Sequence, residues 1–283
     1  MAGAVEYLLI GHLSADLTPD GRRILGGTVS FAARVAHAFG LRVGLVTSAR
    51  PCEPLLAEVL PYVSGLKVVE AEATTSFENR YGAEGRTQFV RAQAAPIGLT
   101  DIPIEWMTAP LVHLAPLASE VDAALARAFP SATTMLTPQG WLRQWDTDGL
   151  VRYKRWYDPA ALAALDMVVL SEEDIAADPA LAHLYAQAAR CVVVTRGEHG
   201  GVCYHRGETF AYEADRVEVV DVTGAGDVFA ASLLAACALL GGKLRAAVQV
   251  AARLATRSVT RPGLAGAPTS EEAQQALAEL RND

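Results

Sequence analysis

The first two thirds of the chain alternate between short apolar runs and segments with helical periodicity. Continuous apolar runs are typical of strands that are buried on both faces of a sheet. We therefore expect strands at Val5–Gly11, Arg42–Ser48, Leu111–Ala115, Ala132–Thr137, Met167–Ser171 and Val192–Thr195. Helices are predicted from Gly26-Gly27 to Gly40, at Ser119–Phe129 and at Pro179–Arg190. This order predicts right-handed parallel crossovers and an α/β fold, a three-layer α/β/α sandwich with a mostly parallel central sheet.

Two segments depart from this order. Ala15–Leu25 is polar and rich in turn residues, whereas Thr74–Arg91 alternates in hydropathy and has an expected hairpin turn at Gly82–Gly85. Both follow predicted strands of the main sheet, so we expect them to pair into a small β-flap, with lid segments at about 15–25 and 74–91. The pattern alone fits two separate surface loops equally well. We expect a single domain over residues 1–283.

A glycine-rich turn dominates the last third of the chain. The sequence Thr223-Gly224-Ala225-Gly226-Asp227 joins a predicted strand, Glu218–Asp221, to a strongly apolar helix, Val228–Leu240. Further helices are predicted at Lys243–Ser258 and at Ser270–Arg281, the last with Thr269 or Ser270 as its N-cap.

The chemistry of this turn suggests phosphoryl transfer. Unpaired amides and the helix dipole make the start of a helix an anion site, and Asp227 stands in the first turn, where it can accept the proton of an attacking hydroxyl. The same residues also fit a tight connection with a capping aspartate. The Walker pattern GxxxxGK[ST] is absent, and Phe229 stands where a Rossmann GxGxxG turn needs its last glycine.

Composition narrows the class of protein. The chain has 283 residues, 51% of them hydrophobic, and a net charge of −8, which favours a folded protein and argues against nucleic acid as a partner. The longest apolar stretch, Val228–Leu240, is too short to span a bilayer, and no signal peptide is visible. The cysteines are dispersed and form no CxxC pair, so we expect a cytoplasmic, reducing location and no membrane association.

The glycine turn closely resembles a known family signature. DVTGAGDVFAASLLAA (221–236) is similar to the C-terminal signature of the ribokinase-like (PfkB) carbohydrate kinases. Other segments agree with that family in the same order: the pair Gly26-Gly27, Ser171–Asp174 in place of Asn-x-x-Glu, VVVTRGEHGG (192–201) and SVTRPGLAGAPTSEEA (258–273). The resemblance therefore covers about residues 5 to 280. It implies a ribokinase-like fold that carries a small β-flap.

The resemblance implies a role for each matched residue. Asp227 would be the catalytic base, and Gly224, Ala225 and Gly226 would supply the anion-hole amides. The implied donor-side contacts, for ATP, are Ser171, Thr195, Gly197, Gly200 and Thr223. Asp174 would act on Mg²⁺ through water.

On the acceptor side, the resemblance implies that Asp16 accepts from substrate hydroxyls and that Gly26 and Gly27 allow close approach to the backbone. The segments GGTVSF, TTSFENRY and TPQGWLR resemble the myo-inositol kinase-like branch of the family. In that branch Phe77 and Asn79 of the flap would lie over the substrate. Gln139 and Arg143 follow the end of a predicted strand, where ligands of α/β sheets gather.

Four positions depart from the family pattern. Phe31 stands where many members have a sugar-binding Asn, Ser171 and Asp174 replace Asn and Glu, and Ala252 replaces an adenine-side Asn. The resemblance implies an ATP- and Mg²⁺-dependent kinase for a small sugar or polyol, with myo-inositol or a similar cyclitol as the first candidate acceptor. The alternatives are a nucleoside or other sugar kinase, a pyridoxal-type kinase without a flap, and a non-catalytic sensor of nucleotide or sugar. We also expect a homodimer through the lid, because an isolated two-stranded ribbon is marginal in water.

Overall fold

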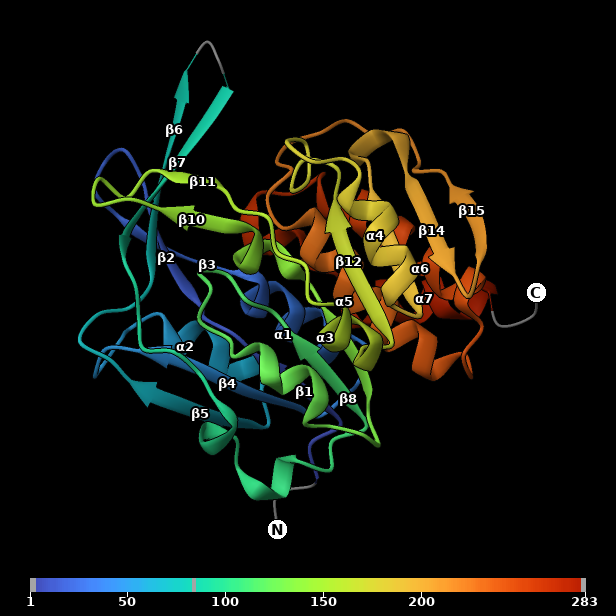
Figure 1. Ribbon diagram of the computed structural model, residues 1–283, viewed down its shortest axis with the longest axis horizontal. Coiled ribbons are helices and arrows are strands. Elements are labelled where there is room, and N and C mark those ends of the chain that lie inside the picture. The colour runs from blue at the N-terminus through green and yellow to red at the C-terminus, as the bar shows by residue number, and fades with distance from the viewer. Residues whose placement is uncertain (1–3, 83–84, 281–283) are drawn as a thin grey trace.

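The protein, seen here as a computed structural model that describes residues 4–82 and 85–280, is built around one large sheet (Figure 1). The strand order is β15-β14-β13-β12-β9-β8-β1-β4-β5. The strands are β1 (Tyr7–Ile10), β4 (Val43–Ala49), β5 (Gly65–Glu70), β8 (Leu111–Leu114), β9 (Thr133–Leu136), β12 (Met167–Ser171), β13 (Cys191–Thr195), β14 (Gly201–His205) and β15 (Glu208–Tyr212). The strands from β13 to β5 pair in parallel, and β14 and β15 form an antiparallel extension at one edge.

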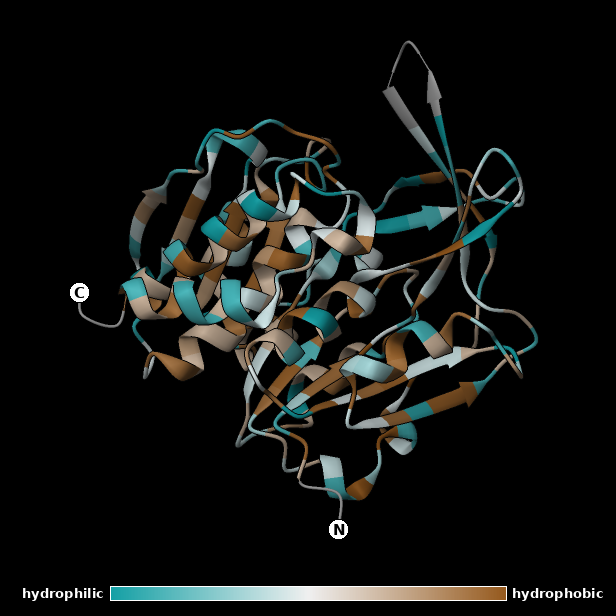
Figure 2. Ribbon diagram, turned by 180° about the vertical axis from the view of Figure 1, so that it is seen from behind, coloured by the Kyte–Doolittle hydropathy of each residue, from teal (hydrophilic) through white to brown (hydrophobic). Residues whose placement is uncertain are grey.

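Helices cover both faces of this sheet, which completes the three predicted layers. One apolar cluster joins one face of the sheet to α1 (Thr28–Ala38), α5 (Ala225–Leu239), α6 (Leu244–Ser258) and α7 (Ser270–Leu280). The other cluster joins the opposite face to α3 (Pro159–Ala164) and α4 (Leu181–Ala188), and the short α2 (Leu56–Val59) follows β4. Seen from behind, the helices of the first cluster turn hydrophilic residues outward (Figure 2). Within the described ranges, none of these helices is long and apolar enough to cross a bilayer.

A second, four-stranded sheet lies beside the large one. Its order is β3-β2-β6-β7, formed by β2 (Ser14–Leu17), β3 (Arg23–Gly26), β6 (Ser76–Gly82) and β7 (Gly85–Ala92). β2 pairs with β3 antiparallel and with β6 in parallel, so the two departing segments of the sequence do meet. The predicted β-flap is therefore present, while the tip of its expected turn, residues 83–84, lies outside the described part of the chain.

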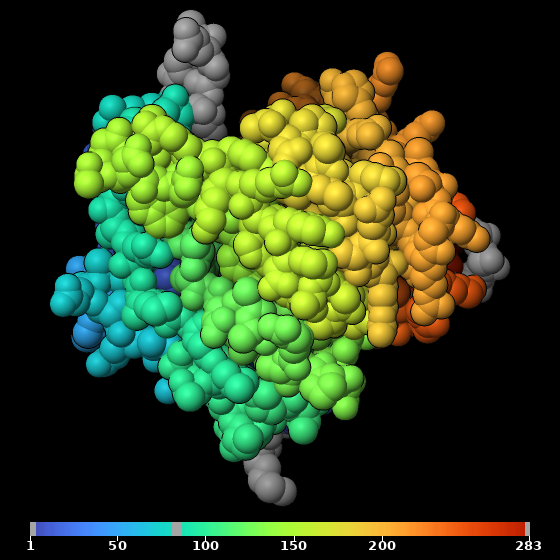
Figure 3. Space-filling view, in the orientation of Figure 1, coloured from blue at the N-terminus to red at the C-terminus, as the bar shows by residue number. Residues whose placement is uncertain are grey.

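A hairpin that the sequence pattern did not predict packs against this flap. It consists of β10 (Arg143–Trp145) and β11 (Val151–Tyr153), and it lies beside β7 (Figures 1 and 3). The amide of Val90 on β7 donates to the carbonyl of Gly149 over 2.8 Å, and Phe89 forms an isolated bridge with Leu150. A buried cluster of Phe77, Val90, Leu117 and Ala118 fills the space beneath.

Two predicted elements are wrong. Instead of a helix over Ser119–Phe129, a short 3-10 helix spans Ala123–Arg127 behind an Asp122 N-cap. In the described part of the chain, Glu218–Asp221 does not form the predicted strand, because β15 already occupies that edge of the sheet. The amides of Val220 and Asp221 donate to the carbonyl of Val259 instead. The other predicted strands and helices are present, with ends shifted by a few residues, and a capping box at Thr269 and Glu272 starts α7.

Candidate active site

The predicted base lies where two helices begin. Asp227 stands in the first turn of α5, directly after the glycine turn, and part of its surface stays accessible. Thr28, the first residue of α1, makes a side-chain hydrogen bond to this carboxylate, and Asp174 and Arg143 interact with it electrostatically. Residues from three other parts of the chain therefore meet Asp227.

The electrostatics of Asp227 follow from its surroundings. Desolvation raises the pKa of Asp227 to about 6, the carboxylate of Asp174 adds to this rise, and the hydroxyl of Thr28 and the guanidinium of Arg143 oppose it. A carboxyl group with a pKa near 6 is largely ionised at pH 7 and still basic enough to accept a proton. This balance suits a general base better than the ordinary aspartate value does.

The glycine turn has the conformation that a helix-start anion site needs. Gly224 is the N-cap of α5 with φ at +79°, in the left-handed region that favours glycine. A Cβ at Gly224 would stand 2.2 Å from Cε1 of Phe31, so no larger residue fits beside that ring. Phe31 itself is 3% exposed and packs against the turn rather than standing open to a ligand.

The turn after β12 brings two predicted residues into one network. Asp174 accepts the backbone amide of Ser171 through Oδ2 at 3.0 Å and the side-chain amide of Gln139 through Oδ1 at 3.3 Å. The hydroxyl of Ser171 accepts the amide of Glu173 at 2.9 Å. Both side chains thus cap this turn, and Asp174 also faces Asp227.

The donor set suits a hard cation held through water. Asp174 and Asp227 are two carboxylates close enough to raise the pKa of one by the charge of the other, and such a pair is what Mg²⁺ uses together with water and phosphate oxygens. Across residues 4–82 and 85–280 there is no group of three His, Cys, Asp or Glu side chains arranged to hold a metal on its own. A cation here would therefore depend on phosphate oxygens for its remaining ligands.

The acceptor-side residues gather where β2 and β3 meet α1. A Cβ on Gly26 would stand 2.6 Å from Oδ2 of Asp16, and Gly27 has φ at +88° close to the carbonyl of His12. Asp16 also accepts the hydroxyl of Ser14 at 3.0 Å. The carboxylate of Asp16 therefore lies directly against Gly26.

The flap residues occupy different environments. Asn79 accepts the side-chain amide of Gln88 across β6 and β7 at 3.0 Å and stays partly exposed. Phe77 is 2% exposed and packs with Val90 and Leu117. Phe77 thus shapes the flap from within, while Asn79 keeps accessible surface.

Sequence reasoning missed Thr28 and Glu120, which shape the site together with His12. Thr28 has no periodic or compositional signal beyond its place after the glycine pair. Glu120 is 2% exposed and accepts the backbone amides of His12, Leu117 and Ala118, which ties together the chain after β1 and after β8. His12 is fully buried and bonds through both ring nitrogens, to Thr75 and to the carbonyl of Ala95, so it anchors the flap.

Three of the predicted donor-side residues, Thr195, Gly197 and Gly200, lie at the end of β13 and in the turn that follows it. Thr195 ends β13, and its carbonyl accepts the amide of Glu172 at 3.0 Å. Gly197 and Gly200 both have positive φ, and a Cβ on Gly200 would stand 2.0 Å from the carbonyl of Tyr212. Tyr212 stacks on Phe229 of α5 and lines a cavity of about 660 Å³ between β15 and α6. Ala252 lines the same cavity.

The glycine turn is braced from the other side by Asp221. This carboxylate accepts the amide of Thr223 at 2.9 Å and the amide of Gly263 at 2.8 Å. Desolvation pushes the pKa of Asp221 up, but these hydrogen bonds outweigh it and leave the pKa below its ordinary value. Beside this turn, Val219, Val220 and Val222 are 54%, 61% and 68% exposed.

The fold matches solved kinases over nearly its whole length. The chain is similar to a ribokinase from Thermotoga maritima, with a TM-score of 0.76 and 18% identity over 98% of this chain and 100% of that one. It is also similar to a pyrophosphate-dependent kinase of the ribokinase family complexed with a pyrophosphate analog and myo-inositol, with a TM-score of 0.80 and 20% identity over 95% of this chain and 99% of that one. The protein therefore has the ribokinase-like fold with its small accessory sheet.

The sequence comparisons find similarity to sugar and nucleoside kinases. Residues 160–271 match the family described as pfkB family carbohydrate kinase. A cytidine kinase from Thermococcus kodakarensis is 29% identical over 82% of this chain and 88% of its own length, and a fructokinase from Escherichia coli is 29% identical over 92% and 95%. The family match thus covers the part of the chain that holds the glycine turn and Asp227, and the relatives that are similar over most of the chain are kinases.

Proposed function

We propose that this protein is an ATP- and Mg²⁺-dependent kinase that phosphorylates a hydroxyl group of a small polyol or sugar, with myo-inositol or a similar cyclitol as the first candidate. The observation that carries this proposal is the position of Asp227. It lies in the first turn of α5, behind a left-handed glycine turn, with Arg143 and Asp174 facing it and a pKa raised to about 6. A base and an anion site at one helix start are the two parts that phosphoryl transfer needs.

In this mechanism Asp227 accepts the proton of the acceptor hydroxyl as its oxygen attacks the phosphoryl group. The amides of Gly224 and Gly226 at the start of α5 stabilise the charge on the transferring group, whereas the amide of Ala225, the third predicted donor, donates to the carbonyl of Val222 at 3.3 Å. Arg143 offsets the charge of Asp227 and keeps it ionised near neutral pH. Asp174 would hold Mg²⁺ through water, and the ion would supply positive charge against the donor phosphates.

The acceptor proposal rests on the polar groups around the glycine pair. Asp16 presents a carboxylate beside Gly26, and a carboxylate accepts from two neighbouring hydroxyls, which suits a polyol. Asn79, Gln139 and Arg143 add amide and guanidinium donors from the flap and the loop after β9. A structural neighbour that binds myo-inositol supports a cyclitol, while the cytidine kinase and fructokinase relatives keep nucleosides and other sugars as alternatives.

The donor proposal rests on apolar surface beside the glycine turn. Val219, Val220 and Val222 are exposed there, and the cavity lined by Tyr212 and Ala252 adjoins the turn that holds Gly197 and Gly200. A flat apolar surface next to a phosphate site favours a nucleotide base and gives inorganic pyrophosphate nothing to contact. Because one structural neighbour is a pyrophosphate-dependent kinase, the two donors must be compared directly.

We further propose a homodimer through the flap and a cytoplasmic location without nucleic-acid or membrane partners. Ile24 on the edge strand β3 is 48% exposed, and an apolar residue on a free sheet edge favours pairing with a second copy. The proposed location rests on the four cysteines, which are all free thiols and form no disulfide. Light scattering that finds a monomer at every concentration would contradict the dimer.

The test is a matrix of donors and acceptors. Purified protein is assayed for product formation with ATP, GTP or pyrophosphate against polyols including myo-inositol, hexoses, ribose and nucleosides, with Mg²⁺ present or chelated. We expect turnover with ATP and a polyol, and its loss on chelation. Tight ATP binding without turnover for any acceptor would support the sensor alternative instead, and turnover with pyrophosphate alone would overturn the donor.

A further inference from the structure

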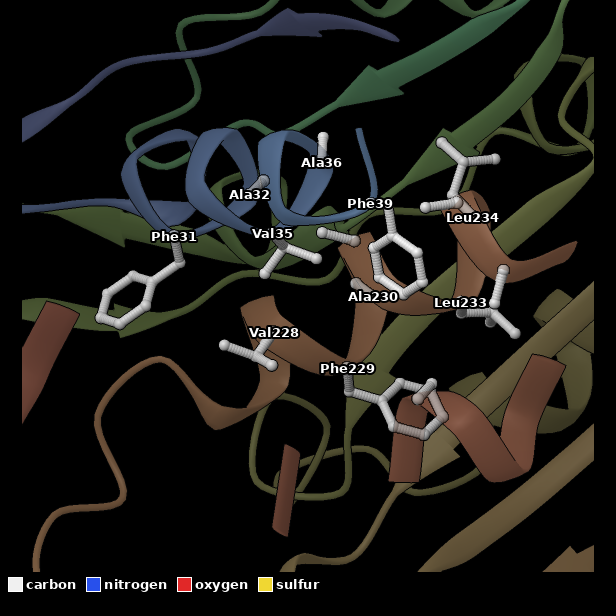
Figure 4. Close-up of a cluster of buried hydrophobic side chains, with 14 of the residues drawn as sticks. Phe31, Ala32, Val35, Ala36, Phe39, Val228, Phe229, Ala230, Leu233 and Leu234 are labelled. Carbon is white, nitrogen blue, oxygen red and sulfur yellow. The ribbon is translucent and has the colours of Figure 1, made fainter. Parts of the chain in front are cut away.

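The first turn of α1 packs directly against the start of α5. Phe31 on α1 lies against Gly224, the N-cap of α5, so closely that a Cβ there would stand 2.2 Å from Cε1 of the ring. Figure 4 shows Phe31 and Val35 on the side of α1 that faces Val228 and Phe229 of α5. The aromatic ring therefore backs the glycine turn on the side away from solvent.

Thr28 makes the matching contact one turn earlier. Its side chain is 3% exposed and hydrogen-bonds to the carboxylate of Asp227. Thr28 and Phe31 are three residues apart on α1, and Gly224 and Asp227 are three residues apart at the start of α5. Residues at this spacing share one face of a helix, so two side chains of α1 face both ends of the first turn of α5.

This part of α1 is held firmly. Gly27 has φ at +88° and fixes the direction in which α1 begins, and a Cβ there would stand 2.8 Å from the carbonyl of His12. The hydroxyl of Ser30 donates to the carbonyl of Gly26 at 2.7 Å. Because this turn is already fixed and buried, its side chains can hold their partners in one position without a further loss of conformational entropy.

We propose that Thr28 and Phe31 are positioning residues for phosphoryl transfer: Thr28 orients the carboxylate of Asp227, and Phe31 holds Gly224 so that the amides of the turn point at the transferring group. The inference rests on the proposed role of Asp227 as the base. It also assigns a use to Phe31, at the position where many relatives have a polar residue. Neither side chain touches the reacting atoms, so their effect belongs to the chemical step and not to substrate binding.

The test compares kcat with KM in conservative variants. Thr28→Val keeps the shape and removes the hydroxyl, and Thr28→Ser keeps the hydroxyl. We expect Thr28→Val to lower kcat by about 10- to 100-fold with both KM values within about twofold, and Thr28→Ser to recover most of kcat. Phe31→Leu should likewise lower kcat and leave the KM of the acceptor unchanged.

Controls separate this inference from protein stability and from the proposed function. Thr134→Val removes another buried hydroxyl, which bonds to Asp166 at the opposite end of the sheet, and should leave kcat unchanged. The inference is overturned if Thr28→Val has the kcat of the wild type, if Thr28→Ser is as impaired as Thr28→Val, or if Phe31→Leu raises the acceptor KM with kcat unchanged. An active Asp227→Asn variant would instead overturn the proposed function itself.

Discussion

The side-chain amide of Gln139 donates to the carboxylate of Asp174 over 3.3 Å and joins the loop after β9 to the turn after β12. The two residues are 35 positions apart in sequence. The hydrogen bond connects a residue that we assign to the acceptor side with one that we assign to the metal and donor phosphates. We therefore expect a substitution at Gln139 to affect the position of Asp174, and a substitution at Asp174 to affect Gln139, through this one hydrogen bond.

Asp227→Asn should remove turnover while the protein stays folded. The amide cannot accept a proton, and a positioned base contributes about 10²–10⁴ in rate, so kcat should fall at least by that factor. Because the pKa of Asp227 is raised to about 6, the stability cost of ionising it builds up from about pH 4 to 6 and is present in full above pH 6. The variant should therefore unfold at the same or a higher temperature at pH 7.5. Kinetics and thermal unfolding check both statements. The matched control is Asp122→Asn at a distant N-cap, which should keep full activity.

Activity should rise with pH through about 6. Asp227 works as a base only when ionised, and its pKa of about 6 is set by desolvation and Asp174 on one side and by Thr28 and Arg143 on the other. The profile of kcat/KM against pH should therefore have an acid limb centred near pH 6. Arg143→Gln should move that limb to higher pH, because the opposing positive charge is lost. A limb that stays in place in this variant would argue against Asp227 as the titrating group.

Glu53→Gln should loosen the attachment of the flap. The buried Glu53 carboxylate accepts from Arg23 on β3 at 2.9 Å, from Arg50 at 3.0 Å and from Thr74 at 2.6 Å. Desolvation opposes its ionisation, but these hydrogen bonds prevail and hold the pKa of Glu53 at about 2. Both arginines are partly exposed, so we expect a loss of about 1–3 kcal/mol in the free energy of unfolding.

The pH dependence of this contribution has a definite sign. A lowered pKa means that Glu53 stabilises the fold above about pH 4.5 and that this stabilisation is lost as the pH falls toward 2. Urea unfolding at pH 7 and at pH 3 should show a larger difference between wild type and variant at pH 7. Glu58→Gln, on the exposed side of α2, serves as the control and should change little.

Gly149→Ala should displace the β10–β11 hairpin from the flap. Gly149 has φ at +79°, and a Cβ there would stand 2.3 Å from the carbonyl of Val90 on β7. Arg143 begins the same hairpin, so we expect a higher KM for the acceptor together with lower thermal stability. Gly207→Ala is the control, because Gly207 has a similar φ of +85° and a Cβ there would lie in open space. This variant carries the same backbone strain of about 1–2 kcal/mol without a steric clash. Equal KM values in the two variants would argue against a role of the hairpin in acceptor binding.

The sequence pattern predicts the parallel sheet well because each of its inner strands is a continuous apolar run that both helix layers cover. It fails at Ser119–Phe129, where the helical periodicity is outweighed by tertiary contacts. There Glu120 turns inward to accept three backbone amides, and Ser119 has φ at +58° with its hydroxyl donating to the carbonyl of Gly140. It also misses the β14–β15 hairpin, whose strands have no continuous run of buried residues like that of the inner strands.

The candidate site was predictable to the extent that its residues lie in local motifs. The glycine pair, the glycine turn and Asp227 are contiguous patterns with a physical reason of their own. Thr28 and Phe31 were not predictable as partners of the turn, because their contacts depend on how α1 packs on α5 and no spacing within one helix reveals a neighbour in another. The β10–β11 hairpin was missed for a similar reason, since its strands are three residues long and gain their place from the flap.

Gly26 and Thr28 are two positions apart in the chain, yet Gly26 borders Asp16 and Thr28 bonds to Asp227. Redesign of the acceptor preference is therefore constrained, because a position that borders the acceptor site and a position that contacts the base are near neighbours in the sequence. Substitutions in the tripeptide 26–28 would change the acceptor and disturb the base at the same time, so a library aimed at new acceptors would lose most of its active members there. Asn79 of the flap, Gln139 and the hairpin residue Arg143 come from separate elements and offer independent positions for diversification.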